Sequence, residues 1–292
     1  MNVAEEDRKG SRVGDRVALG VDAGASLVKL ALHADGVLSH ELLAATEVAA
    51  VVERVGRLGP RSLGLTGAGA GELARQLDAE SVRVTEFSAW GTGVRRLLAA
   101  QRPDVSEPYL LVSLGTGTSV LLAQGLAVSR VGGTALGGGT VMGLGGLLLA
   151  GAPFAEIIAL AAKGDRRRVD LLVSDIYRPG EIALAGDATA ANFGKPRVHA
   201  GTPAREDLAN AIMGLVGENV ALICTGLAAA HGVRRIVYGG STLRGNSALR
   251  LVLSLITAAF GREALFLEDG EFAGAIGALE LSGGLGPRLT TR

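Results

Sequence analysis

The sequence has few cysteines, histidines or aromatic residues, and each shortage excludes a class of site. Its 292 residues include one cysteine, Cys224, and four histidines without HExxH or CxxC spacing, so neither an intrachain disulfide nor a zinc site is expected. Aromatic residues, at 3%, are too few for stacking platforms that bind bases or sugars. Lys+Arg 29 balance Asp+Glu 29, which argues against a nucleic-acid partner. Any anionic ligand must be bound by local groups.

The chain shows no segment that the sequence alone would assign to a membrane. Residues 1–15 are rich in charge and contain no apolar stretch, so we expect a flexible N-terminus and a cytoplasmic protein. Residues 131–155 carry no charge, but nine of them are glycines and the continuous apolar run is short. We therefore expect a buried helix that begins after a glycine loop, and no membrane partner.

Glycine is abundant: 44 residues, about 15%, roughly twice the ~7% usual in globular proteins. Familiar glycine motifs do not fit. No lysine follows the glycines of 132–139 as a P-loop requires, Glu72 takes the third glycine position of a dinucleotide fingerprint, and the hydrolase elbow is absent around Ser113 and Ser241.

The glycines instead separate apolar strands. Residues 17–32 predict a strand, a tight DAGAS turn and a second strand, and 109–134 repeat this pattern around SLGTGTS. Short strands at 62–66 and 82–85 are each followed by a helical pattern. This repetition indicates an internal duplication, with an N-terminal lobe at 16–105 and a C-terminal lobe at 106–292.

The C-terminal half predicts further alternating elements. Residues 205–231 read as an amphipathic helix with one apolar stripe from Leu208 to Leu227. RIVYGG at 235–240 and ALFLE at 264–268 read as strands, and SALRLVLSLITAAF at 247–260 and FAGAIGALELSGG at 272–284 read as helices.

Turns rich in Gly, Ser and Thr present N–H groups and hydroxyls to a phosphate chain, without bulky side chains in its path. An Asp at the end of the first strand would hold Mg²⁺ against those phosphates. Taken singly, either turn could equally be a plain β-turn. Together, and with the strand-GG-S at 237–241, they favour a nucleotide clamp.

The sequence resembles the sugar kinase, actin and heat-shock chaperone ATPase superfamily, and within it the bacterial type II pantothenate kinases. The resemblance spans residues 17–280 in family order and is carried by GVDAGASLVKLAL, TEFSAWGTGVRRLL, LVSLGTGTSVLL, SRVGGTALGGGTVMGLGGLL, DLLVSDIY, GDATAANFGK, RIVYGGSTLRGN and FLEDGEFAGAIGAL. It implies a duplicated ribonuclease H-like, two-lobed α/β fold with a nucleotide cleft between the halves.

The resemblance also implies an activity and its residues. The activity is ATP-dependent phosphorylation of pantothenate to 4'-phosphopantothenate, with Mg²⁺ bound at Asp22, in a homodimer that coenzyme A or its acyl esters inhibit. Glu86 matches the catalytic carboxylate, and Arg130, Ser119 and Thr134 match the substrate side. The ATP-binding positions are Asp22, Ala23, Gly24, Ala25, Ser26, Leu27, Val28, Lys29, Thr116, Gly137, Gly138, Gly139, Thr140, Val141, Phe154 and Ser241.

One departure and two alternatives accompany this interpretation. The family's first loop usually reads DAGGT, and the methyl of Ala25 would disturb the turn if that position needs a positive φ. A kinase of the same fold could act on another small alcohol such as an amino sugar, because fold does not fix substrate. A nucleotide-dependent switch ATPase without a small substrate is the second alternative.

Overall fold

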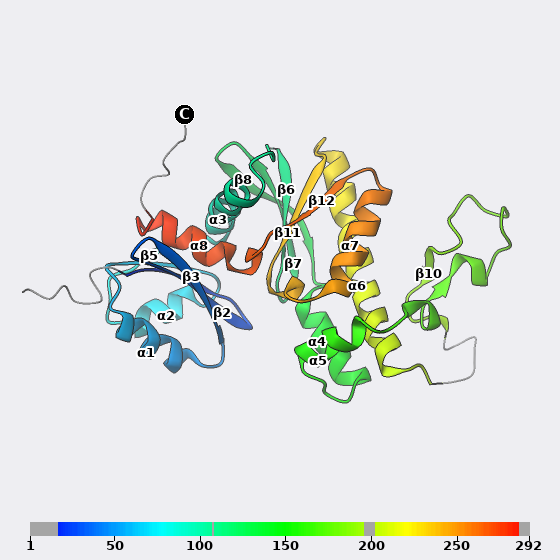
Figure 1. Cartoon of the computed structure of the whole chain (residues 1–292), viewed down its shortest axis with the longest axis horizontal. Helices are drawn as coiled ribbons and strands as arrows, with labels where there is room; N and C mark the ends of the chain where they lie inside the picture. The colour runs from blue at the N-terminus through cyan, green and yellow to red at the C-terminus, as the bar shows by residue number, and fades with distance from the viewer. Residues whose placement is uncertain (1–16, 107, 196–201, 286–292) are drawn as a thin grey trace, which may run out of the picture. The chain divides into compact units, whose positions relative to one another are not determined.

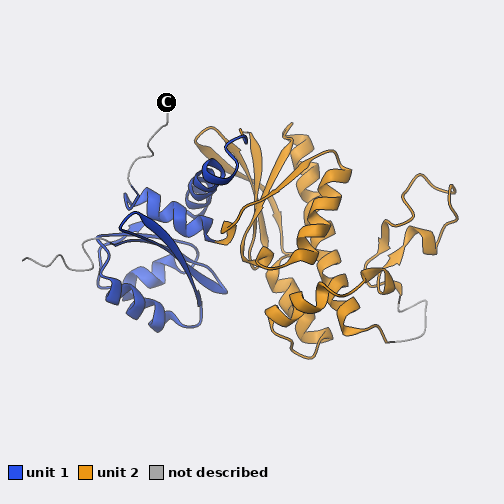
Figure 2. Ribbon diagram, in the orientation of Figure 1, with its two compact units in different colours: residues 1–105, 272–292 blue, residues 106–271 orange. Residues whose placement is uncertain are grey.

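In a computed structural model of the chain, residues 17–106, 108–195 and 202–285 are described. The predicted flexible N-terminus, 1–15, lies outside them. The chain forms two compact units, one made of residues 1–105 and 272–292 and the other of residues 106–271 (Figure 2). The final helix therefore belongs to the same unit as the first strands.

Unit 1 is a five-stranded mixed sheet of order β3-β2-β1-β4-β5 (Figure 1). The first three strands are antiparallel neighbours, whereas β4 and β5 run parallel to β1. Its strands are β1 (Ala18–Ala23), β2 (Leu27–Ala34), β3 (Val37–Ala44), β4 (Ser62–Thr66) and β5 (Val82–Arg83), and its helices are α1 (Val48–Leu58), α2 (Ala70–Gln76), α3 (Glu86–Gln101) and α8 (Ala273–Leu281).

The two faces of strand β1 carry side chains of different size, and different helices cover them. Leu19 and Val21 enter an apolar cluster with Val51 of α1 and Leu73 of α2. Gly20, between them, faces α8, where a Cβ on it would lie 2.0 Å from a backbone oxygen. Alternation of large and small residues thus lets α8 approach the sheet more closely than α1 and α2 can.

Unit 2 repeats the topology of unit 1 with the order β12-β11-β6-β7-β8, which confirms the duplication predicted from the sequence. A small separate sheet joins β9 and β10. Its strands are β6 (Tyr109–Leu114), β7 (Thr118–Gln124), β8 (Ala127–Thr134), β9 (Leu171–Leu172), β10 (Thr189–Ala191), β11 (Arg235–Gly239) and β12 (Glu263–Phe266), and its helices are α4 (Gly138–Leu148), α5 (Phe154–Ala161), α6 (Arg205–Ala230) and α7 (Ser247–Ala259). Single 3₁₀ turns are η2 (Arg166–Arg168), η3 (Val173–Asp175), η5 (Ser241–Leu243) and η6 (Gly270–Phe272), the last at the boundary between the units.

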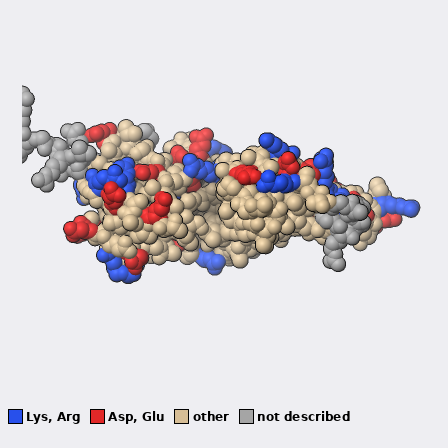
Figure 3. All heavy atoms as spheres, turned by 90° about the horizontal axis from the view of Figure 1, so that it is seen from below, with Lys and Arg blue, Asp and Glu red and all other residues tan. Residues whose placement is uncertain are grey.

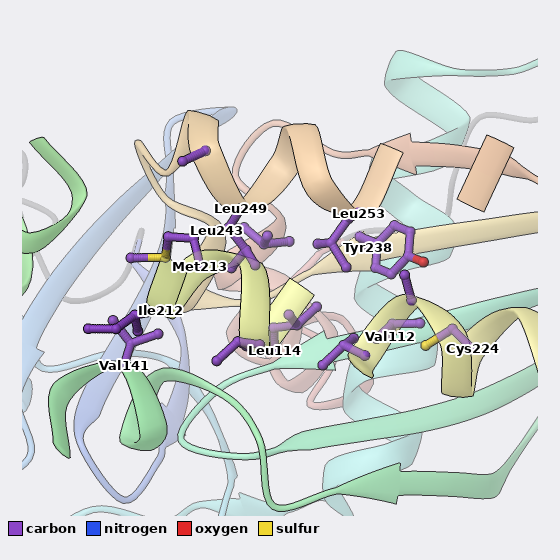
Figure 4. Packing of buried hydrophobic residues seen from close by; sticks show 14 of the residues in the cluster. Val112, Leu114, Val141, Ile212, Met213, Cys224, Tyr238, Leu243, Leu249 and Leu253 are labelled. Carbon is purple, nitrogen blue, oxygen red and sulfur yellow. The ribbon is translucent and has the colours of Figure 1, made fainter. Parts of the chain in front are cut away.

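Helix α6 is the centre of the unit 2 core (Figure 4). The predicted single apolar stripe is wrong, because Met213, Val216, Ala221 and Cys224 are buried as well and burial extends around most of the helix. The helix is also the one in the described part of the chain that is long and apolar enough to cross a membrane. Two thirds of its most apolar stretch is covered by the unit, as in a core helix.

Helix α4 begins after a glycine loop as predicted, but its burial is only partial. Val141 and Gly145 are buried, whereas Met142 and Leu147 are exposed, the latter by 82%. The expectation of a buried helix is therefore wrong for its outer face. Helix α4 packs against α5 and α6, and the side chains of Met142 and Leu147 lie outside these contacts.

A buried polar cluster fixes the segment around β9 and β10 to α6. Glu218 of α6 accepts hydrogen bonds from Thr189 (2.7 Å) and Asn192 (3.1 Å), and Arg166 Nη1 lies 2.7 Å from its carboxylate. Asp170, fully buried, accepts from the Phe193 backbone at 2.9 Å, and its burial raises the pKa of the carboxyl. The GDATAANFGK motif thus contributes contacts that anchor this segment.

Candidate active site

Asp22, near the end of β1, is buried to 97% and carries the central charge of the unit 1 site. Its cross-strand partners are Lys29 on β2 and Thr66 on β4. The Lys29 ammonium lies 3.3 Å from Asp22 Oδ2, so the two charges form an ion pair. The carboxylate is packed closely, because a Cβ on Gly67 would lie 2.7 Å from one oxygen and a Cβ on Gly274 2.8 Å from the other.

The turn after Asp22 tolerates the residue that departs from the family pattern. The Gly24 N–H donates to the carbonyls of Asp22 (3.2 Å) and Leu27 (3.1 Å), which closes the turn. Ala25 is exposed and does not adopt a positive φ. Its methyl group therefore causes no backbone strain, and the concern raised by the sequence does not apply.

Glu86 is the first residue of α3 and lies in the electrostatic field of Asp22 and Lys29, although about 60 residues separate it from them in the chain. It is exposed. Partial desolvation raises the pKa of its carboxyl, the charge of Asp22 raises it further, and Lys29 opposes both. Glu86, Asp22 and Lys29 therefore interact electrostatically within unit 1. A raised pKa suits a carboxylate that is to accept a proton.

An open hollow of about 390 Å³ lies beside Glu86 in unit 1. Its lining residues are Gly67, Ala68, Ala70, Arg83, Val84, Thr85 and Glu86. One wall, from the β4–α2 loop, offers only glycine and alanine. The other, from the β5–α3 segment, carries the polar side chains. Sequence reasoning missed Arg83, whose signal was its position three residues before Glu86.

The residues around Asp22 also fit the Mg²⁺ that ATP chemistry uses. Asp22 supplies a hard, anionic oxygen ligand of the kind that Mg²⁺ prefers. Thr66, its cross-strand neighbour, is fully buried, and its Oγ1 has no hydrogen-bond partner within the described parts of the chain. A metal-bound water would satisfy that hydroxyl. One carboxylate with water and phosphate oxygens is an ordinary Mg²⁺ ligand set.

The SLGTGTS turn of unit 2 is bonded to the start of α4 and to η5. The N–H groups of Gly138 and Gly139 donate to the carbonyls of Gly115 (2.8 Å) and Thr116 (2.9 Å). Thr242 Oγ1 donates to the same Gly115 carbonyl at 2.9 Å. Three segments predicted to bind nucleotide are therefore tied together at one place.

These bonds affect how the predicted nucleotide residues can act. Because the N–H groups of Gly138 and Gly139 already have partners, these glycines can offer a bare backbone surface rather than free donors. The Gly137 N–H donates to Thr140 Oγ1 at 3.3 Å, and Val141 is buried in the core. The sequence pointed to Ser241, whereas the neighbouring Thr242 makes the bond to the turn.

A β-bulge positions Arg130. Ser119 pairs with Gly133 across β7 and β8, and an irregularity between Val120 and Leu121 shifts the register so that Arg130 pairs with Leu121. The extra residue brings Arg130 to the face of Gly133, since its Nη2 would lie 2.7 Å from a Cβ on that glycine. The structure therefore gathers Arg130 and Ser119.

Two predicted residues lie apart from that pair. Thr134 is one position beyond Gly133, on the opposite face of β8, and its Oγ1 accepts a hydrogen bond from the Leu136 N–H at 3.2 Å. Phe154 begins α5 and packs, half-buried, against the unit 2 core. Neither position joins the face that carries Arg130.

Comparison with known proteins decides the family. Residues 68–280 match the family model described as Fumble. The type II pantothenate kinase of Staphylococcus aureus strain USA300 is 36% identical over 266 residues, covering 90% of this chain and 98% of that protein. The enzyme of the same name from Staphylococcus saprophyticus is 33% identical over 264 residues, with 90% and 99% coverage. The chain belongs to the type II pantothenate kinase family.

Solved structures confirm the fold that this family implies. The activator of the 2-hydroxyisocaproyl-CoA dehydratase from Clostridium difficile, with bound ADPNP, matches with a TM-score of 0.61 at 17% identity, covering 91% of this chain and 94% of that one. A ROK family glucokinase from Streptomyces griseus, with glucose and AMPPNP, matches with a TM-score of 0.56 at 15% identity, covering 92% and 100%. At such low identity the likeness establishes the two-lobed α/β fold alone.

Proposed function

We propose that the chain transfers the γ-phosphoryl group of ATP to the primary hydroxyl of pantothenate, in the first step of coenzyme A biosynthesis. The observation that carries this proposal is Glu86, a carboxylate that lines an open hollow and whose pKa is raised by desolvation and by the charge of Asp22, the partner of Lys29. The full-length similarity to type II pantothenate kinases supports pantothenate as the acceptor.

In this proposal Glu86 accepts the proton of the acceptor hydroxyl. A base works best when its pKa lies near the working pH, and both desolvation and the charge of Asp22 move the Glu86 pKa upward from the ordinary glutamate value. The Lys29 charge opposes this rise in the Glu86 pKa, because a nearby cation favours the anionic form of the carboxyl. The hollow beside it leaves room for the alcohol.

We propose nucleotide-binding residues in each unit. Asp22 would hold Mg²⁺, which supplies positive charge to the phosphates during transfer. Lys29, adjacent to Asp22, provides a flexible ammonium for the same phosphates. In unit 2 the SLGTGTS turn offers hydroxyls and backbone to the phosphate chain, and the glycines that start α4 let the nucleotide approach the backbone.

Arg130 and Ser119, brought to one face by the bulge in β8, are proposed to bind the acceptor. A guanidinium donates in a fixed fork to a carboxylate or an amide oxygen. A cytoplasmic homodimer, with coenzyme A or its acyl thioesters as inhibitors, completes this proposal.

A coupled ADP-release assay tests the proposal. The purified chain is given Mg-ATP with pantothenate, pantetheine, N-acetylglucosamine or glycerol. We expect ADP release that depends on pantothenate. Release that depends on N-acetylglucosamine would indicate an amino-sugar kinase, and release without any added alcohol would indicate a switch ATPase.

A further inference from the structure

The hollow of unit 1 holds one cation that the proposed chemistry has not used. Arg83, the last residue of β5, is exposed and lines the hollow together with Glu86. Its backbone belongs to the β4–β5 pairing, but its guanidinium has no hydrogen bond or ion pair with any described residue. By contrast Arg54, Arg75 and Arg96 of the same unit are each paired with a carboxylate.

The wall that carries Arg83 is firmly positioned. The Val84 N–H donates to the Leu65 carbonyl of β4 at 2.8 Å, which ties the β5–α3 connection to the sheet. Thr85 Oγ1 donates to Ser88 Oγ at 2.7 Å, and the Ala89 N–H donates to the Thr85 carbonyl at 3.0 Å, which starts α3. Arg83 and Glu86 therefore lie on either side of an anchored, extended link.

The opposite wall cannot supply a charge to Arg83. Gly67, Ala68 and Ala70 have no ionisable side chain. Glu72, the acid nearest in sequence on α2, is already bonded to Arg75 and Gln76, and these bonds lower its pKa. The guanidinium that lines the hollow is thus available to a ligand.

The positions of Arg83 and Glu86 along the chain are compatible with a ligand that has a hydroxyl at one end and a carboxylate at the other. Three steps of extended chain span at most about 10 Å. In pantothenate, eight bonds separate the primary hydroxyl oxygen from the carboxylate carbon, on the order of 10 Å when extended. An anionic Glu86 would repel the carboxylate end, and a guanidinium fork would bind it, so the charges select one orientation.

We propose that Arg83 is a specificity-determining residue that binds the carboxylate of the acceptor, while Glu86 faces its hydroxyl. This inference rests on the proposed function, because it takes pantothenate as the acceptor. It also divides the work of the two arginines: Arg83 recognises the carboxylate, and Arg130 is left to the amide portion of the molecule.

The test compares pantothenate with pantothenamide, in which a neutral amide replaces the carboxylate, as substrates in steady-state kinetics. We expect Arg83→Gln to raise KM for pantothenate about 10- to 100-fold, as for the loss of one charged hydrogen bond. Its kcat, and both constants for pantothenamide, should stay within about twofold. Arg83→Lys should restore part of the loss. Arg130→Ala should weaken the use of both compounds alike.

Arg75→Gln, on the exposed side of α2, is the matched control and should leave both substrates unaffected. Since the Arg83 guanidinium has no described partner, Arg83→Gln should have the same melting temperature as the wild type. Equal losses on both compounds, or no loss on either, would overturn the role of Arg83 alone. A wild-type chain that phosphorylates neither compound would overturn the proposed function, and this inference with it.

Discussion

Glu86 is the residue on which transfer to an alcohol depends most. Glu86→Gln keeps the size of the side chain but cannot accept a proton, so kcat should fall about 10²- to 10⁴-fold while ATP and pantothenate bind nearly as before. Steady-state kinetics measures the change in kcat, and isothermal titration calorimetry measures the binding of ATP and pantothenate. Glu80→Gln, an exposed carboxylate on the loop before β5, is the control.

A pH profile gives an independent check on the same residue. Because the base must be deprotonated, kcat/KM should fall as pH drops through the Glu86 pKa. That acid limb should lie above the ordinary value of about 4.3, since desolvation and Asp22 raise the Glu86 pKa. The limb should disappear in Glu86→Gln. If the variant retains more than about a tenth of native kcat, the base is elsewhere.

Asp22 combines a functional charge with a structural one. Asp22→Asn should abolish most turnover, and because it leaves the Lys29 ammonium without its partner it should also lower the melting temperature. Asp22→Asn with Lys29→Met should recover the melting temperature but not turnover. Asp78→Asn, exposed after α2, should change neither. Near-normal turnover in Asp22→Asn would remove this residue from the mechanism.

At the scale of elements, the contact between α3 and α8 depends on glycine. A Cβ on Gly277 would lie 1.8 Å from the Ala89 carbonyl oxygen, and a Cβ on Gly93 would lie 1.8 Å from that of Ala273. Gly277→Ala must therefore separate the helices, and we expect a loss of about 1–3 kcal/mol of unfolding free energy. Urea unfolding measures it.

Gly56→Ala is the matched control and should act in the opposite direction. Gly56 lies in the exposed interior of α1, where a Cβ meets nothing within 4 Å. The substitution should stabilise the chain by about 0.5–1 kcal/mol, through helix propensity alone. If Gly277→Ala is as stable as the wild type, the tight packing of α3 and α8 is not required.

The sequence predicted the positions of strands and helices better than it predicted which of their faces are buried. Alternating apolar residues around small turns located β1, β2, β6, β7 and β8, because a strand with a hairpin turn leaves a strong local pattern. Helix α1 was missed, because its N-cap residue, Glu47, is not one of the residue types that mark the start of a helix in a sequence. The burial of α6 on most of its sides was missed too, because the sequence of one helix does not show how many other elements pack against it.

The candidate site residues came from the family motifs, and their roles stay predictions. Asp22 and Glu86 were found through resemblance, yet their electrostatic coupling depends on long-range folding that no local pattern shows. Arg83, Thr66 and Thr242 were missed because isolated Arg and Thr residues are common on surfaces and in turns. The bulge that reorients Arg130 is likewise invisible in the sequence, since one extra residue changes no motif.

At the scale of the whole molecule, we expect a homodimer, as family resemblance implies. Light scattering at micromolar concentration should give twice the 29.6 kDa chain mass. Helices α6 and α7 carry exposed leucines, among them Leu222, Leu251 and Leu255, and we expect these to take part in the interface. Leu255→Glu should then yield monomers, whereas Leu126→Glu, in the turn after β7, should not. A monomer mass for the wild type would contradict the expectation.

The face of mixed acidic and basic residues in Figure 3 agrees with the chain's formal charge of +0. The electrostatic attraction of the whole chain for a distant anion or cation is therefore weak. Encounter with anionic substrates should depend little on ionic strength, and recognition is left to the few buried or lining charges of the site.

The return of α8 to the first unit has a consequence for how the chain is made. On the ribosome, β1 and β4 emerge early, but the helix that covers their glycine face is synthesised after residue 271. Residues 106–271 form a continuous unit, which can fold before α8, the helix that completes unit 1, has been synthesised. Translation that terminated before α8 would thus yield a chain whose second half can fold and whose first sheet exposes the face that carries Asp22.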